Sequence, residues 1–504
     1  MASKNLINLE SASKAFDIKP LLLNVSLGLS EGERIGVVGR NGGGKSTLLK
    51  AVFGLIKPDS GEIKIGGTPI VFGDTAGVIS RGVGMVHQHF QLVPVMTVAE
   101  NLILGDEPKR GLFINQKSAR EEIITLSKRY GLEVDPDAVI EDLPVGMQQR
   151  VEILKALRKD VKLLILDEPT AVLTPQEIDE LLEVIRNLAK SGVGVVLITH
   201  KLHEVMAVAD RVVVLRGGKL VGTTSPKETD EAGLAQMMVG RSVVLQVNRT
   251  EAKRGAVVLE VKGLEVRDDR KIMSVKGVDL TLHKGEILGV AGVEGNGQRE
   301  LVEAICGMRH REAGSVLVNG EATKDMNPHS VHEAGISHVP EDREKHGLVA
   351  NYTIADNLVL NQFDQEPFAK GWVRNLGEVA KNAVQLVEKF DIRTPSAFNT
   401  AGSLSGGNKQ KVVVARELSE ELPVLIAAQP TRGVDVGSIE FIHNQLIAAR
   451  DGGAGVLLVS AELDEILSLS DRIAVMSDGK IVAIVESKDA DRNYIGRLMA
   501  GLKE

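Results

Sequence analysis

One stretch of the chain has the residue types and the spacing of a phosphate-binding loop. It reads Gly39, Arg40, Asn41, Gly42, Gly43, Gly44, Lys45, Ser46 and Thr47. Apolar residues flank it, so we expect a strand at 35–38 and a helix at 48–53 around a tight turn. Backbone N–H groups of such a turn point at phosphate oxygens, and the helix N-terminus adds positive potential. The pattern predicts that Lys45 reaches the β- and γ-phosphates of a nucleoside triphosphate and that the Ser46 hydroxyl holds Mg²⁺.

Two adjacent carboxylates, Asp167 and Glu168, end a second apolar stretch at 162–166. Neighbouring side chains of a strand point to opposite faces, so the two groups can have different tasks. We predict that Asp167 binds Mg²⁺ and that Glu168 polarises the water that attacks the γ-phosphate. A carboxylate pair before a proline is often only a turn. Its position one domain length after the phosphate loop favours the catalytic interpretation.

Two more polar residues follow predicted strands. His200 comes after 195–198, and Gln88 comes after 83–86. We predict that His200 contacts the γ-phosphate and stabilises developing charge, and that Gln88 reaches the metal or the water. Each signal is weak alone, because a histidine at a strand end is usually structural or solvated. The glycine-rich loop alone could likewise be a simple turn with a solvated lysine.

The elements that would position these residues occur twice. Residues 32–39 recur in similar form at 285–292, and residues 143–150 recur at 404–411. A repeat of domain size indicates duplication, with strands and helices alternating as in a parallel α/β sheet. We therefore predict two α/β domains at 4–241 and 257–504 with a polar linker at 242–256. Each should have a mainly parallel sheet, an antiparallel β layer and a helical subdomain.

The composition narrows the function classes. The chain has 504 residues, a net charge of −8 and one cysteine, Cys306. The charge disfavours a protein that wraps nucleic acid, and one cysteine excludes an internal disulfide framework. We expect Cys306 to be a small buried residue. No apolar run approaches the roughly 20 residues that cross a bilayer, so a role at a membrane would need a partner.

These parts, in this order, resemble the ATP-binding cassette family of P-loop NTPases over essentially the whole chain, twice. The most specific piece is Leu404-Ser405-Gly406-Gly407, which is similar to the family's signature loop. The resemblance implies ATP and Mg²⁺ as cofactors. It also implies that Ser405, Gly406 and Gly407 grip the γ-phosphate of ATP held by the opposite cassette, and that Phe16 stacks on adenine. A core phenylalanine is the alternative for Phe16.

The two copies differ in their chemistry. In the second copy the positions of the predicted catalytic residues carry other side chains, namely Gln298, Arg299, Ala428, Gln429, Ala461 and Glu341. In the first copy the signature position carries Pro144 and Val145, which lack a hydroxyl and a glycine. Cassettes of the family pair head to tail. The resemblance therefore implies that the two cassettes pair within one chain, with one complete site that hydrolyses ATP.

A degenerate second copy and the residues His338–Arg343 resemble the ATPases of bacterial simple-sugar and nucleoside importers. The resemblance implies two transmembrane permease subunits, an extracytoplasmic solute-binding protein and a place on the cytoplasmic face of the membrane. The permeases would dock after Gln88 and after Glu341, with a possible groove at Phe90–Asn101. One alternative is a soluble tandem-cassette protein that acts on the ribosome. Another is a structural subunit that binds nucleotide without turnover.

Overall fold

The computed structural model describes residues 5–16, 19–40, 43–87, 90–110, 113–170, 173, 175–199, 201–240, 249–293, 295–434, 436–499 and 501. The chain divides into two compact units, which we name unit 1 (Met1–Val243) and unit 2 (Val244–Glu504). Each is described by itself. Both are α/β, as predicted.

The main sheet of unit 1 has the strand order β12-β11-β3-β10-β9-β6. Its strands are β3 (Arg34–Gly39), β6 (Val83–Val86), β9 (Leu163–Asp167), β10 (Gly194–Ile198), β11 (Arg211–Arg216) and β12 (Lys219–Thr224). All neighbours are parallel except the edge pair β11–β12. The parallel strands are apolar and buried, as expected for a sheet covered on both faces. Their carboxyl ends share one edge of the sheet.

A second, antiparallel sheet of unit 1 has the order β2-β1-β4-β5. Its strands are β1 (Asn5–Phe16), β2 (Lys19–Ser30), β4 (Ser60–Ile65) and β5 (Thr68–Pro69). β1 and β2 are longer than the short segments expected from the sequence, because register shifts let the pair continue past its apolar alternation. Buried residues of this layer share a core with α1 and with the face of the main sheet on which α1 lies.

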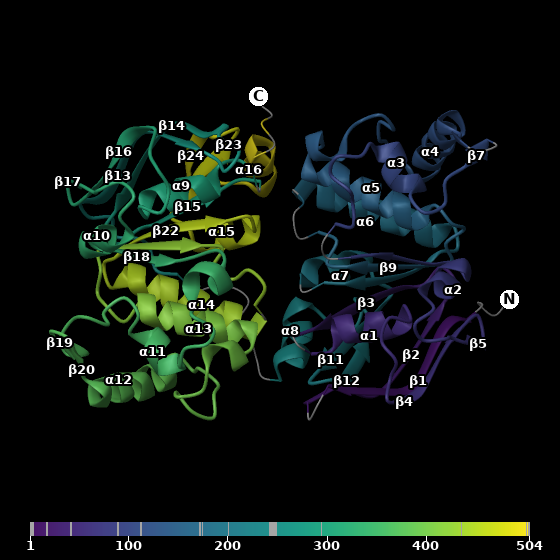
Figure 1. Ribbon diagram of the computed structural model, residues 1–504, viewed down its shortest axis with the longest axis horizontal. Helices are drawn as coiled ribbons and strands as arrows, with labels where there is room; N and C mark the ends of the chain where they lie inside the picture. The colour runs from purple at the N-terminus through teal and green to yellow at the C-terminus, as the bar shows by residue number, and fades with distance from the viewer. Residues whose placement is uncertain are drawn as a thin grey trace. The chain divides into compact units, whose positions relative to one another are not determined.

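The helices of unit 1 cover both faces of its main sheet (Figure 1). They are α1 (Lys45–Val52), α2 (Thr75–Ser80), α3 (Val98–Ile103), α4 (Gln116–Tyr130), α5 (Val145–Leu157), α6 (Pro175–Lys190), α7 (Leu202–Val208) and α8 (Glu231–Val239). The helical subdomain, with α3, α4 and α5, shares a second core with α6. Its start is fixed locally, since Thr97 and Glu100 form a capping box at α3. A small hairpin, β7 (Lys109–Arg110) with β8 (Phe113–Ile114), and the 3₁₀ turn Ile140–Asp142 complete unit 1.

Unit 2 repeats this plan. Its antiparallel sheet contains β13 (Val257–Arg267), β14 (Met273–His283), β16 (Ala313–Val318) and β17 (Glu321–Ala322). Its main sheet contains β15 (Ile287–Ala291), β18 (Ile336–Val339), β21 (Val424–Ala428), β22 (Gly455–Ser460), β23 (Arg472–Ser477) and β24 (Lys480–Glu486), in the order β18-β21-β22-β15-β23-β24. Both sheets match those of unit 1 in strand order and direction.

The helices of unit 2 again lie on both faces of its main sheet, with α13 and α14 on the face opposite α9 (Figure 1). They are α9 (Gln298–Ile305), α10 (Pro328–Glu333), α11 (Ile354–Leu358), α12 (Leu376–Lys389), α13 (Gly406–Glu417), α14 (Val436–Asp451), α15 (Leu463–Leu469) and α16 (Arg492–Met499). A hairpin, β19 (Ala369–Lys370) with β20 (Val373–Arg374), the π-helical turn Arg343–Gly347, and 3₁₀ turns at Ala401–Ser403 and Ser487–Asp489 complete it. Cys306 is buried and free, as expected.

The linker expected at 242–256 stays a prediction, because residues 241–248 lie outside the described part. The chain divides into its two units after Val243. Residues 249–256 belong to unit 2, where Arg254 pairs with Glu486 at 2.5 Å and Thr250 Oγ1 accepts from Arg450 Nη2 at 3.0 Å. Among the described residues, no helix is both long and apolar enough to cross a membrane.

Candidate nucleotide-binding site

The phosphate loop of unit 1 joins β3 to α1, in the strand-loop-helix setting that its pattern requires. Gly44 begins α1 with a φ of 100°, and a Cβ there would collide with the carbonyl oxygen of Leu21. A Cβ on Gly43 would lie 2.8 Å from Arg40 O. The tight curve of the loop therefore requires glycine at both positions. Asn41 and Gly42 lie outside the described residues.

Lys45 is buried inside this loop. Its ammonium donates a hydrogen bond to the carbonyl oxygen of Gly39 at 2.6 Å. The side chain of Ser46 is exposed at the first turn of the same helix, and that of Thr47 is half-buried. A narrow glycine cradle, a positive helix end and an internal ammonium fit a polyphosphate, and the Ser46 hydroxyl at this point fits a metal-bound oxygen ligand.

Asp167 and Glu168 lie at the carboxyl end of β9, on the sheet edge that also carries the phosphate loop. Asp167 is 8% exposed. Burial, helped by the neighbouring charge of Glu168, raises the pKa of Asp167 to about 6, while Lys45 and Lys50 act in the opposite direction. A cation at this edge would stabilise the ionised carboxylate.

Glu168 differs from the expectation drawn from strand alternation. Its φ is 48°, so the chain has already left the extended conformation there. Its N–H donates to the carbonyl oxygen of Ile198 in β10 at 2.8 Å. The left-handed backbone conformation of Glu168, held by this hydrogen bond to β10, therefore sets the direction of its side chain. The alternation of side chains along β9 does not extend to this residue.

Other predicted residues are only partly described. His200 and Gln88 lie outside the described residues, and of Phe16 and Val145 only the backbone is described. Phe16 ends β1, where it faces Lys19 of β2. Their proposed contacts with ATP and Mg²⁺ therefore stay predictions. On either side of His200 the chain is described, and Thr199 Oγ1 accepts a hydrogen bond from Lys201 N at 2.9 Å.

The signature loop of unit 2 begins α13. Ser405 is the N-cap residue and is exposed, and its hydroxyl oxygen accepts from Asn408 Nδ2 at 3.0 Å. Gly406 and Gly407 form the first turn, so their N–H groups belong to a helix N-terminus. In unit 1 the corresponding N-cap residue of α5 is Pro144, and neither N-cap side chain bonds the first turn of its own helix. Only the unit 2 loop therefore has a hydroxyl at its helix start.

The second phosphate loop is occupied by its own side chains. Gln298, at the position of Lys45, donates through Nε2 to Val293 O at 3.0 Å. Arg299, at the position of Ser46, pairs with Glu303 at 2.8 Å. The loop keeps its glycine turn but has neither an ammonium in its interior nor a hydroxyl at its helix start.

The strand end of β21 keeps the shape of its unit 1 counterpart. Gln429 has a φ of 48°, and its N–H donates to Val459 O at 2.7 Å. Its side-chain oxygen accepts from the N–H of Ala461 at 3.2 Å. The carboxamide thus bonds the residue that replaces His200, and no carboxylate is present at Ala428 or Gln429.

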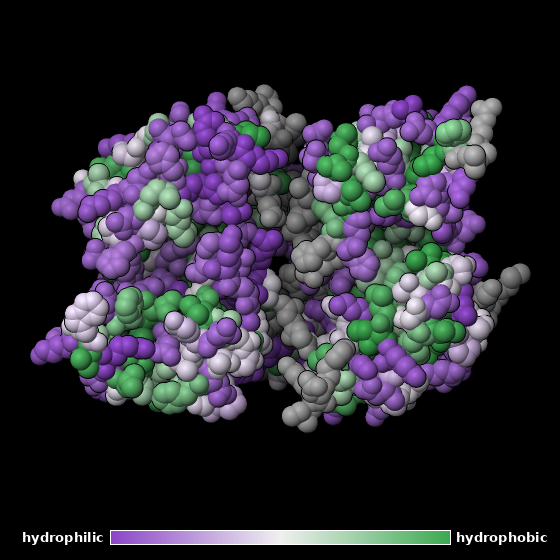
Figure 2. All heavy atoms as spheres, viewed as in Figure 1, coloured by the Kyte–Doolittle hydropathy of each residue, from purple (hydrophilic) through white to green (hydrophobic). Residues whose placement is uncertain are grey.

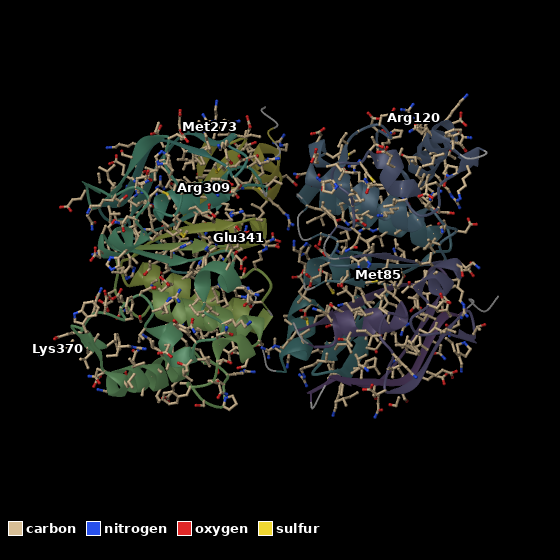
Figure 3. The ribbon with its side chains drawn as sticks, in the orientation of Figure 1. Met85, Arg120, Met273, Arg309, Glu341 and Lys370 are labelled. Carbon is tan, nitrogen blue, oxygen red and sulfur yellow. The ribbon has the colours of Figure 1, made fainter. Side chains whose placement is uncertain are left out.

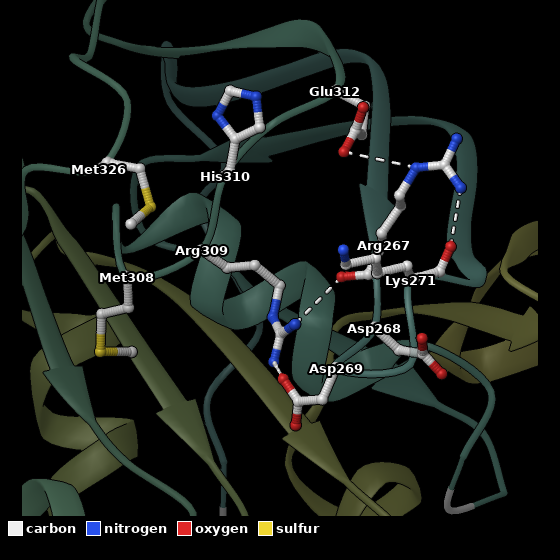
Figure 4. A pocket seen from close by; sticks show the side chains of 9 residues that line it. All are labelled: Arg267, Asp268, Asp269, Lys271, Met308, Arg309, His310, Glu312 and Met326. Carbon is white, nitrogen blue, oxygen red and sulfur yellow. Dashed lines mark hydrogen bonds and ion pairs between the residues drawn. The ribbon is translucent and has the colours of Figure 1, made fainter.

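A hollow of about 610 Å³ lies beside the β13–β14 turn of unit 2 (Figure 4). This turn corresponds to the one that carries Phe16 in unit 1, yet it contains no aromatic residue. Its charges pair with one another, Arg309 with Asp269 at 2.8 Å and Arg267 with Glu312 at 3.4 Å. This cluster was not predicted from the sequence, and the turn has no phenylalanine, tyrosine or tryptophan that would take the place of Phe16.

Two buried carboxylates behind the strand ends were also missed. Glu465 Oε1 accepts from Thr431 Oγ1 at 2.7 Å and lies 2.8 Å from His443 Nε2. Glu204, at the same position in unit 1, is completely buried, and neither of its carboxylate oxygens has a hydrogen-bond partner among the described residues. The signal was available, because both glutamates end the repeated segments 197–204 and 458–465.

Comparison with known proteins extends these observations. The ABC transporter family model matches residues 22–171 and 275–432. Guanosine import ATP-binding protein NupO of Bacillus subtilis is 46% identical and covers 95% of this chain and 94% of its own length. Nucleoside import ATP-binding protein NupA of Lactococcus lactis is 44% identical and covers 99% of each chain. Ribose import ATP-binding protein RbsA 3 of Rubrobacter xylanophilus is 40% identical, also over 99% of each.

A solved ATP-binding cassette of an ABC transporter, in its ADP conformation, covers 47% of this chain and 97% of its own length, with 24% identity and a TM-score of 0.43. The three relatives named above are import ATP-binding proteins, which leaves the ribosome-acting alternative without support. Matches to both halves, and relatives of at least 40% identity along nearly the whole chain, show that the protein belongs to the ABC transporter family and carries two ATP-binding cassettes in tandem.

Proposed function

We propose that this chain is the ATP-hydrolysing subunit of a bacterial importer and drives uptake of a nucleoside or a simple sugar through partner permeases. The observation that carries the proposal is the division of chemistry between the units. Unit 1 has the buried Lys45 and the adjacent carboxylates Asp167 and Glu168 at one sheet edge, whereas unit 2 has Ser405 as the N-cap residue of α13. Each unit supplies what the other lacks.

In this proposal the phosphate loop from Gly39 to Thr47 holds the triphosphate, with Lys45 neutralising its β- and γ-oxygens. Ser46, Gln88 and Asp167 hold Mg²⁺, which when bound neutralises charge that develops on the phosphates. Phe16 stacks on the adenine. These assignments rest on the glycine cradle, on the buried ammonium and on the raised pKa of Asp167, which a cation would lower.

Glu168 acts on the attacking water. Its backbone is held in a left-handed conformation by the hydrogen bond to Ile198 O, so its carboxylate is fixed relative to the β10 strand that leads to His200. A fixed carboxylate can orient a water molecule and accept its proton, while His200 stabilises the charge on the γ-phosphate. The alternative of a structural subunit without turnover leaves this carboxylate without a task.

Ser405, Gly406 and Gly407 complete the site from unit 2, in a head-to-tail pairing of the two cassettes. Support comes from complementary losses, since the unit with the phosphate chemistry has Pro144 where the other has Ser405. A serine hydroxyl with the N–H groups of a helix start forms an anion site, which a proline cannot reproduce.

Permease docking is proposed next to the segments that follow Gln88 and Glu341. In unit 1, Val95 is 73% exposed, and in unit 2 Tyr352 and Phe398 are 53% and 61% exposed. Within unit 2, the N–H of Ala401 donates to Tyr352 O at 2.9 Å, so the segment that contains Phe398 and Ala401 lies beside Tyr352. Figure 2 shows hydrophobic side chains over this part of unit 2, around α11 and α12. Such side chains fit helices of a membrane partner on the cytoplasmic face.

A nucleoside is the solute we favour over a sugar. The nucleoside and guanosine import relatives are 44% and 46% identical to this chain, whereas the ribose import relative is 40% identical. The solute pocket itself would lie in the permeases, after delivery by an extracytoplasmic solute-binding protein.

The decisive experiment is reconstitution of the full chain with candidate permease subunits. We expect ATP hydrolysis that rises when liganded solute-binding protein is added, and uptake of labelled guanosine in preference to ribose. Glu168→Gln is the matched control and should remove both signals. Hydrolysis that never responds to permease or binding protein would contradict the importer proposal, and preferred ribose uptake would contradict the nucleoside assignment.

A further inference from the structure

The segment 341–347 of unit 2 connects β18 to the helical subdomain and passes beside the signature loop. Glu341 begins it and forms an ion pair with Arg432 (Figure 3 labels Glu341). The N–H groups of Glu344 and Lys345 donate to Asp342 Oδ1 at 3.0 and 3.1 Å, which fixes the turn of the segment. The segment is therefore a structured connection between the two parts of unit 2.

Arg343 spans the space between the signature loop and the end of the main sheet. Its Nη1 donates to Arg432 O at 2.8 Å, and Nη2 lies 3.5 Å from Gly433 O, both in the 430–433 loop that follows β21. A Cβ on Gly406 would lie 3.1 Å from the same Nη2. The guanidinium thus lies against the first turn of α13 while it is bonded to the sheet side.

The helical side is bonded to the same segment. Lys409 of α13 pairs with Glu344 at 2.7 Å, and its exposed fraction is only 13%. Arg416 Nη1, from the same helix, donates to Gly347 O at 2.8 Å. The segment 341–347 therefore binds α13 on one side and the 430–433 loop on the other.

Unit 1 has a different connection at this place. Phe90 occupies the position of Arg343, and a phenyl ring cannot donate to a carbonyl oxygen. The neighbouring Gln91 is bonded to α5, because Lys155 Nζ donates to Gln91 O at 2.8 Å and Glu152 accepts from Gln91 N. The signature helix of unit 1 is thus bonded to Gln91, and among the described residues of unit 1 no arginine joins the segment 90–91 to the loop that follows β9.

We propose that Arg343 is a positioning residue that presets the Ser405-Gly406-Gly407 loop for the ATP site of unit 1. The inference rests on the proposed function, because it assumes that this loop completes that site. Unit 2 lacks the lysine, carboxylates and histidine through which a bound nucleotide would align its helical subdomain with its sheet. The bonds of Arg343 to the carbonyl oxygens of the 430–433 loop supply that alignment from within the chain.

The geometry requires the two separate N–H donor groups of a guanidinium. A guanidinium can place two N–H groups toward two successive carbonyl oxygens, whereas a lysine presents a single ammonium. Arg343→Lys should therefore behave much more like Arg343→Ala than like the wild type.

The test is a double-mutant cycle on steady-state ATP hydrolysis by the full chain with its permeases. We expect Arg343→Ala to lower kcat/KM for MgATP by about tenfold, as for one charge-assisted contact. In a Ser405→Ala background the same substitution should cost less than about twofold, because the loop it aligns has already lost its hydroxyl. Arg492→Ala is the control, since Arg492 of α16 pairs with Asp464 of α15 at 2.9 Å, outside the helical subdomain of unit 2.

Three outcomes would overturn the proposal. One is full activity of Arg343→Ala while Ser405→Ala is impaired. Another is multiplicative losses in the double variant. The third is an equal loss for Arg492→Ala, which would point to general destabilisation, and melting curves would report that directly. A wild-type chain without ATP turnover, or a Ser405→Ala variant with full activity, would instead contradict the proposed function itself.

Discussion

The ends of β9 and β21 have the same backbone and different chemistry. Glu168 and Gln429 both have a φ of 48°, and both donate their N–H to the neighbouring strand, at 2.8 and 2.7 Å. One carries a carboxylate and the other a carboxamide bonded to Ala461 N. The comparison teaches that the fold of a cassette holds its catalytic positions in place without help from the catalytic side chains. The replacement of the predicted catalytic residues in unit 2 therefore required no change of backbone conformation at this strand end.

The helix starts of α5 and α13 show the opposite asymmetry. Unit 1, which has the predicted catalytic residues, has Pro144 as the N-cap residue of α5, while unit 2 has Ser405 as that of α13. In the proposed function, each unit supplies one half of a site. If the halves belong to one composite site, substitutions in the kept halves should matter and those in the lost halves should not.

Glu168→Gln should give the largest effect. We expect loss of ATP turnover by at least about 100-fold, because the amide cannot accept the proton of the attacking water. ATP-dependent closure, followed as protection from proteolysis, should persist. Phosphate release is the measurement, and Gln429→Ala is the control that should stay within about twofold of wild type. Residual activity of Glu168→Gln above about a tenth of wild type would contradict a single catalytic site.

Ser405→Ala should give the next largest effect. The loss of one hydroxyl contact to a charged phosphate predicts a decrease in kcat/KM of about tenfold. Pro144→Ala, at the corresponding helix start of unit 1, should change it by less than about twofold. Both variants are compared in the same hydrolysis assay. Equal effects at the two positions would show that the assumed pairing of the halves is wrong.

Asp167→Asn should raise stability while it impairs hydrolysis. Burial raises the pKa of Asp167 to about 6, so the folded chain holds this proton more tightly than the unfolded chain. The free energy of unfolding of the wild type therefore decreases as the pH rises from about 4 to about 6. At pH 7.5 the free energy of unfolding of the asparagine variant should exceed that of the wild type by on the order of 1–3 kcal/mol. Calorimetry without nucleotide or Mg²⁺ would measure it. A gain of the same size at pH 4 would argue against the buried charge as its cause.

Gln298→Ala should give the smallest effect. The Gln298 amide only closes its own loop on Val293 O, so turnover should change by less than about twofold. Lys45→Ala, at the matching position of unit 1, should abolish it. Counting bound nucleotide by equilibrium dialysis would add detail, because an unchanged stoichiometry in Gln298→Ala and a lower one in Lys45→Ala would locate ATP in unit 1.

Much of this architecture could be predicted from the sequence. The repeat, the alternation of strands and helices, and the loop at 39–47 fixed the α/β class and placed the phosphate loop on β3 and α1. The lengths of β1 and β2 could not be predicted, because register shifts extend the hairpin beyond its alternating pattern.

The long-range hydrogen bonds were harder to predict than the phosphate loop. Glu168 was expected to follow strand alternation, but a bond to Ile198 in a distant part of the chain sets its conformation. Arg343 belongs to the segment His338–Arg343, but the sequence predicted no role for it. Its hydrogen-bond acceptors, the carbonyl oxygens of Arg432 and Gly433, are about 90 residues away in sequence. Long-range pairs of this kind leave no periodic signal along the chain.

The left-handed turn at Gln429 has a consequence outside catalysis. A residue other than glycine in this conformation costs about 1 kcal/mol, and unit 2 bears that cost with no water to activate. The same turn swings the chain out of β21 into the loop whose carbonyl groups receive Arg343. In unit 1 this turn holds the proposed general base Glu168, whereas in unit 2 the same turn leads into the loop that binds Arg343. The conserved backbone corner therefore has a mechanical role in the second cassette.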